Sequence, residues 1–305
     1  MPTPAISLKG LTKYYGNDLG VMDVTFEVFP GEVMGFLGPN GAGKTTTMRA
    51  LVGLLKVSSG KAQIRGEEVS IYSHEMRKEI GYLPGSPALY ENLSGWDHLK
   101  FLAQMRGRDC TQEIRSIAER FDLDLGRKIK ELSKGNQQKI GVIQAFMHKP
   151  AVLILDEPTS GLDPIVQREF GALVEETRSR GAAILLSSHV LSEVEHLADR
   201  VVIINAGKQL LVDEISNLKK RTLRTIDLFF SSPVAANVLS NVHGIKDVQM
   251  SGNRVTCTVI GAETELLRIA VEHGLDSVQT HESNLDEIFF SIVEGGDPNG
   301  FATLP

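Results

Sequence analysis

One segment constrains the fold of this 305-residue chain more than any other. Residues 38–47 read GPNGAGKTTT and match the pattern G-x-x-x-x-G-K-[ST]. A β-rich stretch, EVMGFLG, precedes the segment, and a helical pattern, GKTTTMRALVGLL, begins within it. Because the pattern is typical of a phosphate-binding loop between a strand and a helix, it predicts an α/β fold of the P-loop NTPase class.

The loop residues have the chemistry that binding a nucleoside triphosphate requires. Glycines let successive backbone N–H groups converge on phosphate oxygens, and the following helix presents its positive end to them. Lys44 can reach the β- and γ-phosphates, the Thr45 hydroxyl is placed for Mg²⁺, and Thr46 is a further phosphate donor. The residues predicted to bind the nucleotide here are Gly38, Pro39, Asn40, Gly41, Ala42, Gly43, Lys44, Thr45 and Thr46. The alternative is a glycine-rich turn that only connects a strand to a helix.

Strand and helix patterns alternate through the first 220 residues. ISLKGLT and VMDVTFEVF, within residues 6–37, predict short strands, and residues 94–149 are mostly helical in pattern. Three apolar runs follow, AVLILD, AAILLSS and VVIIN, with helical patterns between them. Such alternation predicts a parallel sheet covered by helices on both faces.

Two adjacent acids end the apolar run AVLILD. A strand end is a poor place for charge unless a cation or a polar group lies beside it. With a phosphate-binding loop upstream, Asp156 is predicted to hold Mg²⁺ near Thr45, through water, and Glu157 to polarise the attacking water or accept its proton. The alternative is a pair of exposed acids at the end of a strand.

Five motifs, GPNGAGKTT, LSKGN, LILDEP, SGLD and SSH, follow one another along the chain. In this order they resemble the nucleotide-binding subunits of ABC transporters, and the resemblance covers residues 5–215. It implies a mixed sheet core, an antiparallel β subdomain and a helical subdomain that carries LSKGN. It also implies ATP and Mg²⁺ as cofactors, and a second ATP-binding subunit, expected to be an identical chain, that closes on the first around two ATP molecules.

Ser133 and Gly135 of LSKGN match the signature motif of that family. In the family, the helix that this motif opens faces the γ-phosphate of ATP bound by the opposite subunit, so both residues are expected to contact ATP there. Lys134 and Asn136 depart from the commonest form, LSGGQ. The alternative for Ser133 is a helix cap without a nucleotide role.

Three further positions have roles by resemblance. His189, after AAILLSS, matches the switch histidine that contacts γ-phosphate and holds Glu157 and the attacking water in place. Asp163 of SGLD matches the D-loop aspartate that links the two composite sites. Tyr15 of KYYG resembles the aromatic residue that stacks on adenine, and Tyr14 is the alternative. Either tyrosine can instead pack locally within a strand.

One position departs from the family. After YLP the family commonly has Gln, or Glu in some exporter-like members, whereas this chain has Gly85. A glycine has no side chain with which to ligate Mg²⁺ or sense the γ-phosphate. Either water or a neighbour such as Ser86 takes that place, or metal coupling is weaker here.

The sequence predicts three parts: a cassette at residues 1–220, a small α+β domain at 221–295 and a disordered tail at 296–305. The pattern of the second part is β-α-β-β-α-β-α, with a hairpin turn at residues 251–253. Its closing segment, ESNLDEIFFSIVEG, resembles the last helix of ATPase subunits from drug and antibiotic exporters. A dimer-stabilising or regulatory role and simple packing on its own domain are both open for it.

Composition limits the partners. A formal net charge of −6 argues against a broad nucleic-acid surface, and two distant cysteines form neither a zinc motif nor a disulfide framework. The start of the chain is not a signal peptide, and no run approaches the ~20 apolar residues of a membrane span. For a chain that resembles ABC transporter ATPase subunits, this implies that the permease is a separate transmembrane polypeptide and that the expected location is the cytoplasmic face of the cell membrane.

The sequence thus predicts an ATPase that powers transport, with export as the expected direction. A second hypothesis is a module that closes on ATP without appreciable hydrolysis; Gly85 and the altered signature motivate it, while Glu157 and His189 oppose it. A third is a soluble ABC ATPase of DNA repair or translation. Neither the long coiled coil of the former nor the paired cassettes of the latter occur in the chain.

Overall fold

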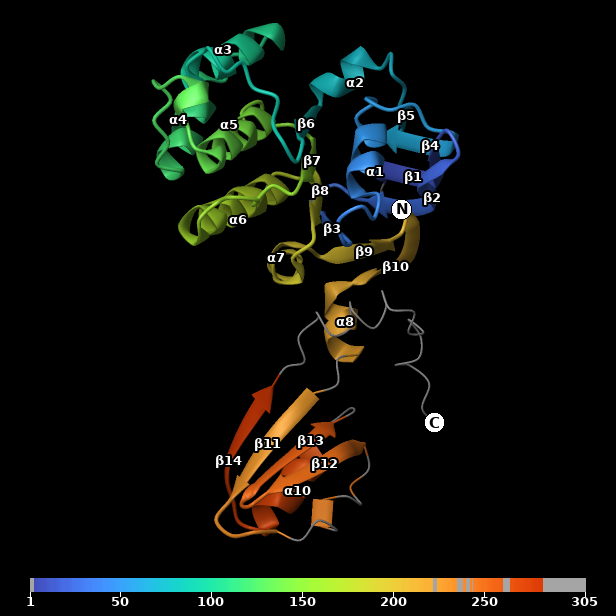
Figure 1. The fold of residues 1–305 in the computed structure, drawn as a ribbon, viewed down its shortest axis with the longest axis vertical. Coiled ribbons are helices and arrows are strands. Elements are labelled where there is room, and N and C mark those ends of the chain that lie inside the picture. Colours follow the sequence, from blue (N-terminus) through green and yellow to red (C-terminus); the bar gives the residue numbers. More distant parts are fainter. Residues whose placement is uncertain are drawn as a thin grey trace. The chain divides into compact units, whose positions relative to one another are not determined.

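The structure is a computed structural model that describes residues 3–221, 224–234, 238–239, 242, 244–259 and 264–281. The chain divides into two compact units, residues 1–215 and 216–305 (Figure 1). No helix among the described residues combines the length and the apolar composition that a membrane crossing requires.

The described part of the first unit contains one mixed sheet. Its strands are β1 (Ile6–Tyr15), β2 (Asp18–Val28), β3 (Val33–Leu37), β4 (Ser59–Ile64), β5 (Glu67–Glu68), β6 (Ile80–Leu83), β7 (Val152–Asp156), β8 (Ala183–Ser188), β9 (Arg200–Asn205) and β10 (Lys208–Glu214). They lie in the order β5-β4-β1-β2-β10-β9-β3-β8-β7-β6. The run β9-β3-β8-β7-β6 is parallel, whereas β1 pairs antiparallel with β2 and β4. The predicted fold class is confirmed.

The central parallel strands are the most apolar. Every residue of β3, β7 and β8 is buried, as expected of strands covered on both faces. The antiparallel strands β1 and β2 are longer than the short strands predicted, at ten and eleven residues. They extend to the pair Tyr15↔Asp18, because backbone pairing continues through polar residues that carry no apolar signal.

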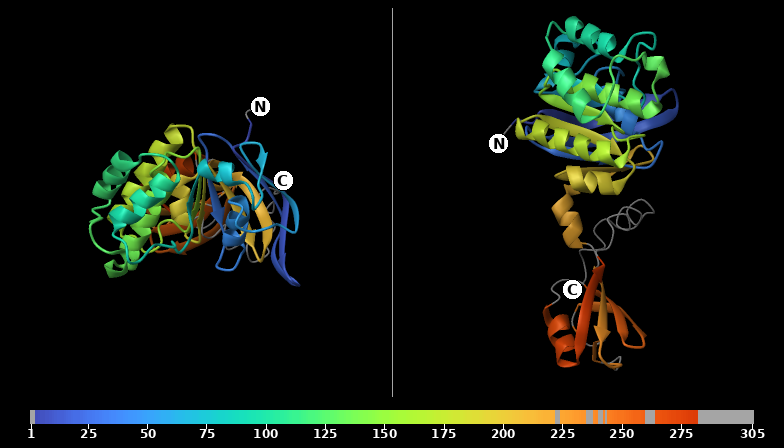
Figure 2. Two further views of the ribbon diagram at one scale, coloured as in Figure 1. Left: turned by 90° about the horizontal axis from the view of Figure 1, so that it is seen from above. Right: turned by 90° about the vertical axis from the view of Figure 1, so that its left-hand side faces the viewer.

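Helices cover the parallel strands on both sides, as predicted. The helices of the first unit are α1 (Lys44–Leu51), α2 (His74–Lys78), α3 (Gly95–Met105), α4 (Thr111–Arg120), the 3₁₀ turn η1 (Ile129–Glu131), α5 (Lys134–Phe146), α6 (Pro164–Ser179) and α7 (Leu191–Leu197). α8 (Ile215–Arg221) follows β10 and begins the second unit. α1 packs against β2, β4 and β7. α6 and α7 pack against each other and against β8, and α7 also packs on β3. Figures 1 and 2 show α5 and α6 on the side of the parallel strands opposite α1.

The stretch from α3 to α5 forms the predicted helical portion. α5 packs against α3, α4 and β6, so it joins this helical subdomain to the sheet. The signature sequence LSKGN lies at the start of α5, at the end of the helix where the first backbone N–H groups have no partner within the helix.

The second unit contains a four-stranded antiparallel sheet in its described part. Its elements are β11 (Arg224–Phe230), β12 (Ile245–Ser251), β13 (Arg254–Val259), α10 (Thr264–Glu272) and β14 (Leu275–His281), with strand order β12-β13-β11-β14. The element order agrees with the predicted pattern, and Ser251 pairs with Arg254 across the predicted hairpin turn. Between β11 and β12, residues 238–239 are helical. The predicted closing helix and the tail lie outside the described residues.

Candidate functional site

The phosphate-binding loop lies between β3 and α1, and the backbone geometry explains why three of its positions are glycines. A Cβ on Gly38 would lie 2.3 Å from the backbone oxygen of Ile204, so only glycine fits there. Gly43 has φ +106°, and a Cβ on it would lie 2.3 Å from Val21 Cγ1. Gly41 has φ +81° in open space. Glycine is thus needed at Gly38 because another backbone segment lies close to it, and at Gly41 and Gly43 because their backbone is left-handed.

The remaining loop residues give it a fixed turn. The backbone N–H of Ala42 donates to the Pro39 carbonyl at 3.1 Å, and the Gly207 N–H donates to the Ala42 carbonyl at 3.0 Å. Ala42 is buried, whereas Asn40 is exposed at the tip of the loop. These contacts tie the loop to the β9–β10 turn, so it is anchored before any ligand arrives.

Lys44, the first residue of α1, is a buried cation with an exposed fraction of 6%. Its Nζ donates to the Gly38 carbonyl at 2.6 Å and to the Pro39 carbonyl at 3.3 Å. It also forms an ion pair with Glu157 Oε1 at 3.2 Å. Glu157 Oε1 accepts no hydrogen bond from any described residue, so this contact is an ion pair without hydrogen-bond geometry. Together these contacts offset the cost of burying the charge.

Asp156, at the end of β7, joins the loop to the sheet. Its Oδ2 accepts a hydrogen bond from Thr45 Oγ1 at 2.7 Å, and its Oδ1 accepts one from Ser187 Oγ at 2.7 Å. The carboxyl group is buried, with the residue only 2% exposed. Asp156 and Thr45 were predicted to share a metal ion, and the structure brings them into direct contact.

The donor set fits Mg²⁺. Thr45 and Asp156 present hard oxygen atoms, the ligand type that Mg²⁺ prefers. No cluster of three or more His, Cys, Asp or Glu residues that could hold a metal occurs among the described residues. In nucleotide sites, one or two protein oxygens and the substrate phosphates commonly share the ion, and the Thr45–Asp156 pair offers such oxygens.

Glu157 and His189 form a pair at the edge of the same site. His189 Nδ1 lies 2.8 Å from Glu157 Oε2, and the His189 side chain is half-exposed. Glu157 has φ +48°, a left-handed conformation that is uncommon for residues other than glycine. The backbone N–H of Glu157 donates to Ser187 Oγ at 3.0 Å. The turn after β7 therefore aims this carboxylate between Lys44 and His189.

The structure distinguishes the two tyrosines of KYYG. Tyr15, at the end of β1, is exposed, and its hydroxyl lies 3.4 Å from Thr46 Oγ1 on α1. Tyr14 directs its hydroxyl to Met22 Sδ, at 3.8 Å. Adjacent residues of a strand point to opposite faces, so only one tyrosine can border the loop. That residue is Tyr15, with Lys13 Nζ 5.2 Å from the centre of its ring.

The signature residues lie apart from the phosphate-binding loop. Ser133 caps α5 by accepting a hydrogen bond from the Asn136 N–H at 3.3 Å. Asp163 caps α6 by accepting from the N–H groups of Ile165 and Val166 at 3.1 and 3.0 Å. Among the described residues, no hydrogen bond or ion pair joins Ser133, Gly135 or Asp163 to the loop. Within one chain these residues are not part of the same site.

Gly135 is in close contact with the SGLD turn. A Cβ on Gly135 would lie 2.6 Å from the backbone oxygen of Gly161, closer than real Cβ contacts come. The start of α5 and the turn that precedes α6 therefore touch through their backbones. This contact connects the position of Ser133 to that of Asp163.

Gly85 lies beside Asp156. A Cβ on Gly85 would lie 3.6 Å from Asp156 Oδ2, an ordinary van der Waals distance, and the residue has no positive φ. The backbone therefore does not require glycine here. A side chain at this position would therefore lie against the buried Asp156 carboxylate, and glycine provides none.

Two contributors were missed at the sequence level. Ser187 binds the Asp156 carboxylate and the Glu157 backbone, and its only sequence signal is its place at the end of the run AAILLSS. Gln138 Nε2 donates to the carbonyls of Glu157 and Pro158 at 3.3 and 3.1 Å. The sequence around Gln138, five residues after Ser133, does not predict this role, because its hydrogen-bond partners are remote in sequence.

Comparisons with known proteins agree with this geometry. The family model described as "ABC transporter" matches residues 21–160. The chain is 35% identical to the bacitracin transport ATP-binding protein BcrA of Bacillus licheniformis, over 95% of the chain and 98% of the relative. It is 38% identical to the lantibiotic transport ATP-binding protein SrtF of Streptococcus pyogenes, over 68% of the chain and 90% of the relative.

Solved structures give the same result. An ATP-binding subunit of an ABC transporter superposes with a TM-score of 0.67 at 31% identity, over 72% of this chain and 93% of that one. The dimeric cassette MJ0796 superposes with a TM-score of 0.64 at 20% identity, over 69% and 98%, a likeness of fold alone. The resemblance found in the motifs is therefore confirmed, and the chain belongs to the family of ABC transporter ATP-binding proteins.

Proposed function

We propose that this chain binds and hydrolyses ATP to power export through a separate membrane permease. ATP binding and hydrolysis are the activity of the family to which it belongs. One observation carries the proposal for this chain: Lys44 and His189 flank the Glu157 carboxylate, and the Thr45–Asp156 pair lies next to it in sequence. A phosphate-binding cation, a magnesium-type oxygen pair and a base are thus joined at one end of β7.

The residues divide the chemistry between them. The loop amides and Lys44 hold the phosphates, and Tyr15 offers a ring for the adenine. Thr45 and Asp156 would hold Mg²⁺, which supplies charge neutralisation at the phosphates when bound. Glu157 polarises the attacking water and accepts its proton, and His189 orients that carboxylate.

A second copy of the chain completes each site in this proposal. Among the described residues, Ser133, Gly135 and Asp163 make no hydrogen bond or ion pair with the loop of their own chain, yet they lie at helix starts whose positive ends suit a phosphate. Two chains closing on two ATP molecules bring each signature motif to the other chain's loop. ATP then acts as part of the interface.

The membrane partner is a permease on another polypeptide, and the ATPase lies at the cytoplasmic face of the membrane against it. The loop that contains Gly85 and the helix α3 that follows are the proposed docking region. Relatives named for bacitracin and lantibiotic transport support an antibiotic as the exported compound. Residues 1–220 act as the cassette, and residues 221–295 as an accessory domain of regulatory or dimer-stabilising role.

A non-hydrolysing switch is the weaker candidate. Gly85 removes a side chain from beside Asp156, and the signature departs from its commonest form. However, the carboxylate and imidazole needed for hydrolysis lie 2.8 Å apart. The intact pair favours turnover.

Steady-state ATPase activity of the wild-type chain and of Glu157→Gln tests the proposal. Losing a general base costs roughly 10²–10⁴-fold in rate, so we expect the variant to hydrolyse at least about a hundredfold more slowly. The variant should still bind ATP, and ATP with Mg²⁺ should convert it from monomer to dimer in light scattering. Equal rates for the two proteins would reject the assignment of Glu157 and favour the switch.

A further inference from the structure

The strand β2 is irregular where it passes the nucleotide site. Lys13 pairs with Val21, whereas the next residue of β1, Tyr14, pairs with Leu19, so Gly20 is an extra residue that the register leaves unpaired. Such a β-bulge bends its strand and changes the direction of the side chains beside it. Bulges are common next to active sites, and this one lies between two parts of the proposed site.

One side of the bulge contacts the ring of Tyr15. A Cβ on Gly20 would lie 2.9 Å from Tyr15 Cε2, 3.2 Å from Tyr15 Cδ2 and 3.0 Å from the backbone oxygen of Lys13. The first distance is shorter than real Cβ contacts, so the ring can lie here only because residue 20 has no side chain. Since the backbone of Gly20 is not left-handed, close approach of the ring is the reason for a glycine at this position.

The other side of the bulge contacts the phosphate-binding loop. The backbone oxygen of Gly20 lies 3.0 Å from the position of a Cβ on Gly43 and 2.9 Å from that of a Cβ on Gly207. Val21 Cγ1 lies 2.3 Å from the same Gly43 position. Gly207 in turn donates its N–H to the carbonyl of Ala42 in the loop. The bulge is therefore packed between the Tyr15 ring and the loop, and its backbone sets their separation.

Two further contacts hold the ring in place. The Tyr15 hydroxyl lies 3.4 Å from Thr46 Oγ1 on α1, and Lys13 Nζ lies over the ring, 5.2 Å from its centre. Lys13 takes part in none of the ion pairs formed among the described residues. A cation over one face of the ring leaves the opposite face for a stacked base, and Tyr15 is 47% exposed, so that face is accessible.

We propose that Gly20 is a positioning residue for the nucleotide. The bulge holds the Tyr15 ring at a fixed distance from the phosphate-binding loop, and Lys13 leaves one face of the ring for adenine. The inference rests on the proposed function, in which Tyr15 stacks on adenine, and adds the residues that set the place of that ring. A ring already held in place binds the base without the entropic cost of ordering an exposed side chain.

Gly20→Ala tests this role, because its methyl group displaces the ring without removing it. The ring is exposed and can turn aside, so we expect the full-length variant to fold, with a thermal unfolding curve close to that of wild type. In calorimetric titrations with Mg²⁺, affinity for ATP should fall roughly three- to tenfold, as expected when a base stack is weakened. Affinity for inorganic triphosphate, which has no base, should not change.

A double variant shows whether Gly20 acts through the ring. With both Gly20→Ala and Tyr15→Ala, ATP should bind as it does to Tyr15→Ala alone, because no ring remains to be displaced. Gly171→Ala is the matched control: it adds the same methyl group to α6, against the flexible end of Leu197, and should bind ATP and triphosphate as wild type does.

Lys13→Met tests the same arrangement without a change near the backbone of β2. Methionine keeps a long apolar stem and removes the charge. ATP affinity should fall roughly two- to fivefold, the size of an exposed cation–π contact, in a chain that has Tyr15. In the Tyr15→Ala background, Lys13→Met should have no further effect.

Four outcomes would overturn the proposal. They are losses of ATP affinity that multiply in the double variant, weaker binding of triphosphate by Gly20→Ala, an effect of Lys13→Met that persists without the ring, and a Gly20→Ala chain that does not fold. The last would show that the methyl group disturbs the strand rather than the exposed ring.

Tyr15→Ala separates this inference from the proposed function. Wild-type ATP affinity in Tyr15→Ala would count against adenine stacking on Tyr15, and so against the proposed function of that residue. Weaker binding by Tyr15→Ala, together with wild-type binding by Gly20→Ala, would count against the role of the bulge alone.

Discussion

The backbone contact between Gly135 and Gly161 predicts the effect of one methyl group. In Gly135→Ala the new Cβ would lie 2.6 Å from the Gly161 oxygen, and both partners belong to the backbone, so no flexible side chain can move aside. The start of α5 and the turn before α6 must separate by roughly 0.8 Å to reach an ordinary contact. Overpacking of this kind costs about 1–3 kcal/mol. At about 2–4 °C per kcal/mol for a domain of this size, we expect the cassette to unfold at a temperature roughly 2–12 °C lower.

The same displacement should reduce activity more than stability. Misplacing a catalytic group by about 1 Å costs on the order of 10²-fold in rate, and Ser133 and Asp163 both move when this contact opens. ATP affinity of the monomer should remain unchanged, because the loop at residues 38–46 is not involved. Calorimetry, ATPase rates and nucleotide binding measure these three quantities.

Gly171→Ala is the matched control. It adds the same methyl group to α6, where the nearest atom is the flexible end of Leu197, 3.3 Å away. Removing a helical glycine should stabilise by up to about 1 kcal/mol and leave ATPase activity at the wild-type rate. If Gly135→Ala behaved like Gly171→Ala in both assays, the argument that this contact positions the signature would be wrong.

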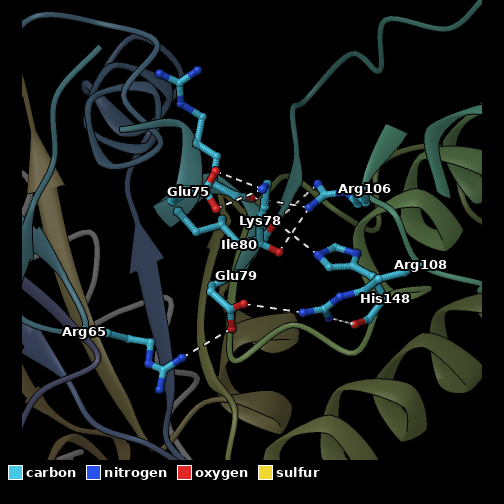
Figure 3. Close-up of polar contacts among 9 residues, drawn as sticks. Arg65, Glu75, Lys78, Glu79, Ile80, Arg106, Arg108 and His148 are labelled. Atoms are coloured by element: carbon cyan, nitrogen blue, oxygen red, sulfur yellow. Dashed lines mark hydrogen bonds and ion pairs between the residues drawn. The ribbon is translucent and has the colours of Figure 1, made fainter. Parts of the chain in front are cut away.

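Three further predictions concern single side chains. Tyr15→Ala should weaken ATP binding roughly tenfold in a fluorescent-nucleotide titration, as expected for one lost stacking partner, while Tyr14→Ala should not. Gly85→Gln should lower the Mg²⁺ concentration for half-maximal nucleotide binding by roughly tenfold, because its amide oxygen adds a ligand for the ion beside Asp156, and Gly85→Ala should leave that concentration unchanged. Burial, with Arg106 nearby (Figure 3), lowers the pKa of His148 from 6.5 to about 4. As the pH falls below 6.5, this histidine is therefore protonated in the unfolded chain before it is protonated in the folded one. Stability from this group is fully present above pH 6.5 and falls by up to about 3 kcal/mol toward pH 4, and urea unfolding of His148→Gln beside wild type should show a smaller acid loss.

Much of the site was predictable because its residues sit beside strong local patterns. The glycines within residues 38–43 predict a loop, and the apolar run VLILD predicts that Asp156 ends a buried strand. Parallel strands then bring the ends of β3, β7 and β8 to one edge, which is why Lys44, Glu157 and His189 meet there.

What was not predictable depends on register and on remote backbone contacts. The choice between Tyr14 and Tyr15 depends on which face of β1 each occupies near its irregular end, and the register of β1 with β2 shifts between Leu11 and Tyr14. The Gly135–Gly161 approach joins two turns whose separation no local pattern encodes.

The hydrogen bonds of Gln138 indicate how the two halves of the site move together. Ser133 and Gln138 lie on the same helix, and the Gln138 amide holds the carbonyls of Glu157 and Pro158. A rotation of α5 that carries Ser133 toward a partner's phosphate must therefore either pull on the Glu157 backbone or break these two hydrogen bonds. Glu157 is already in a left-handed conformation that costs about 1–3 kcal/mol, so its turn has little freedom to follow. In the proposed dimer we therefore expect closure to be coupled to the orientation of the Glu157 carboxylate. Gln138→Leu, which removes both hydrogen bonds, should slow hydrolysis while leaving ATP binding intact.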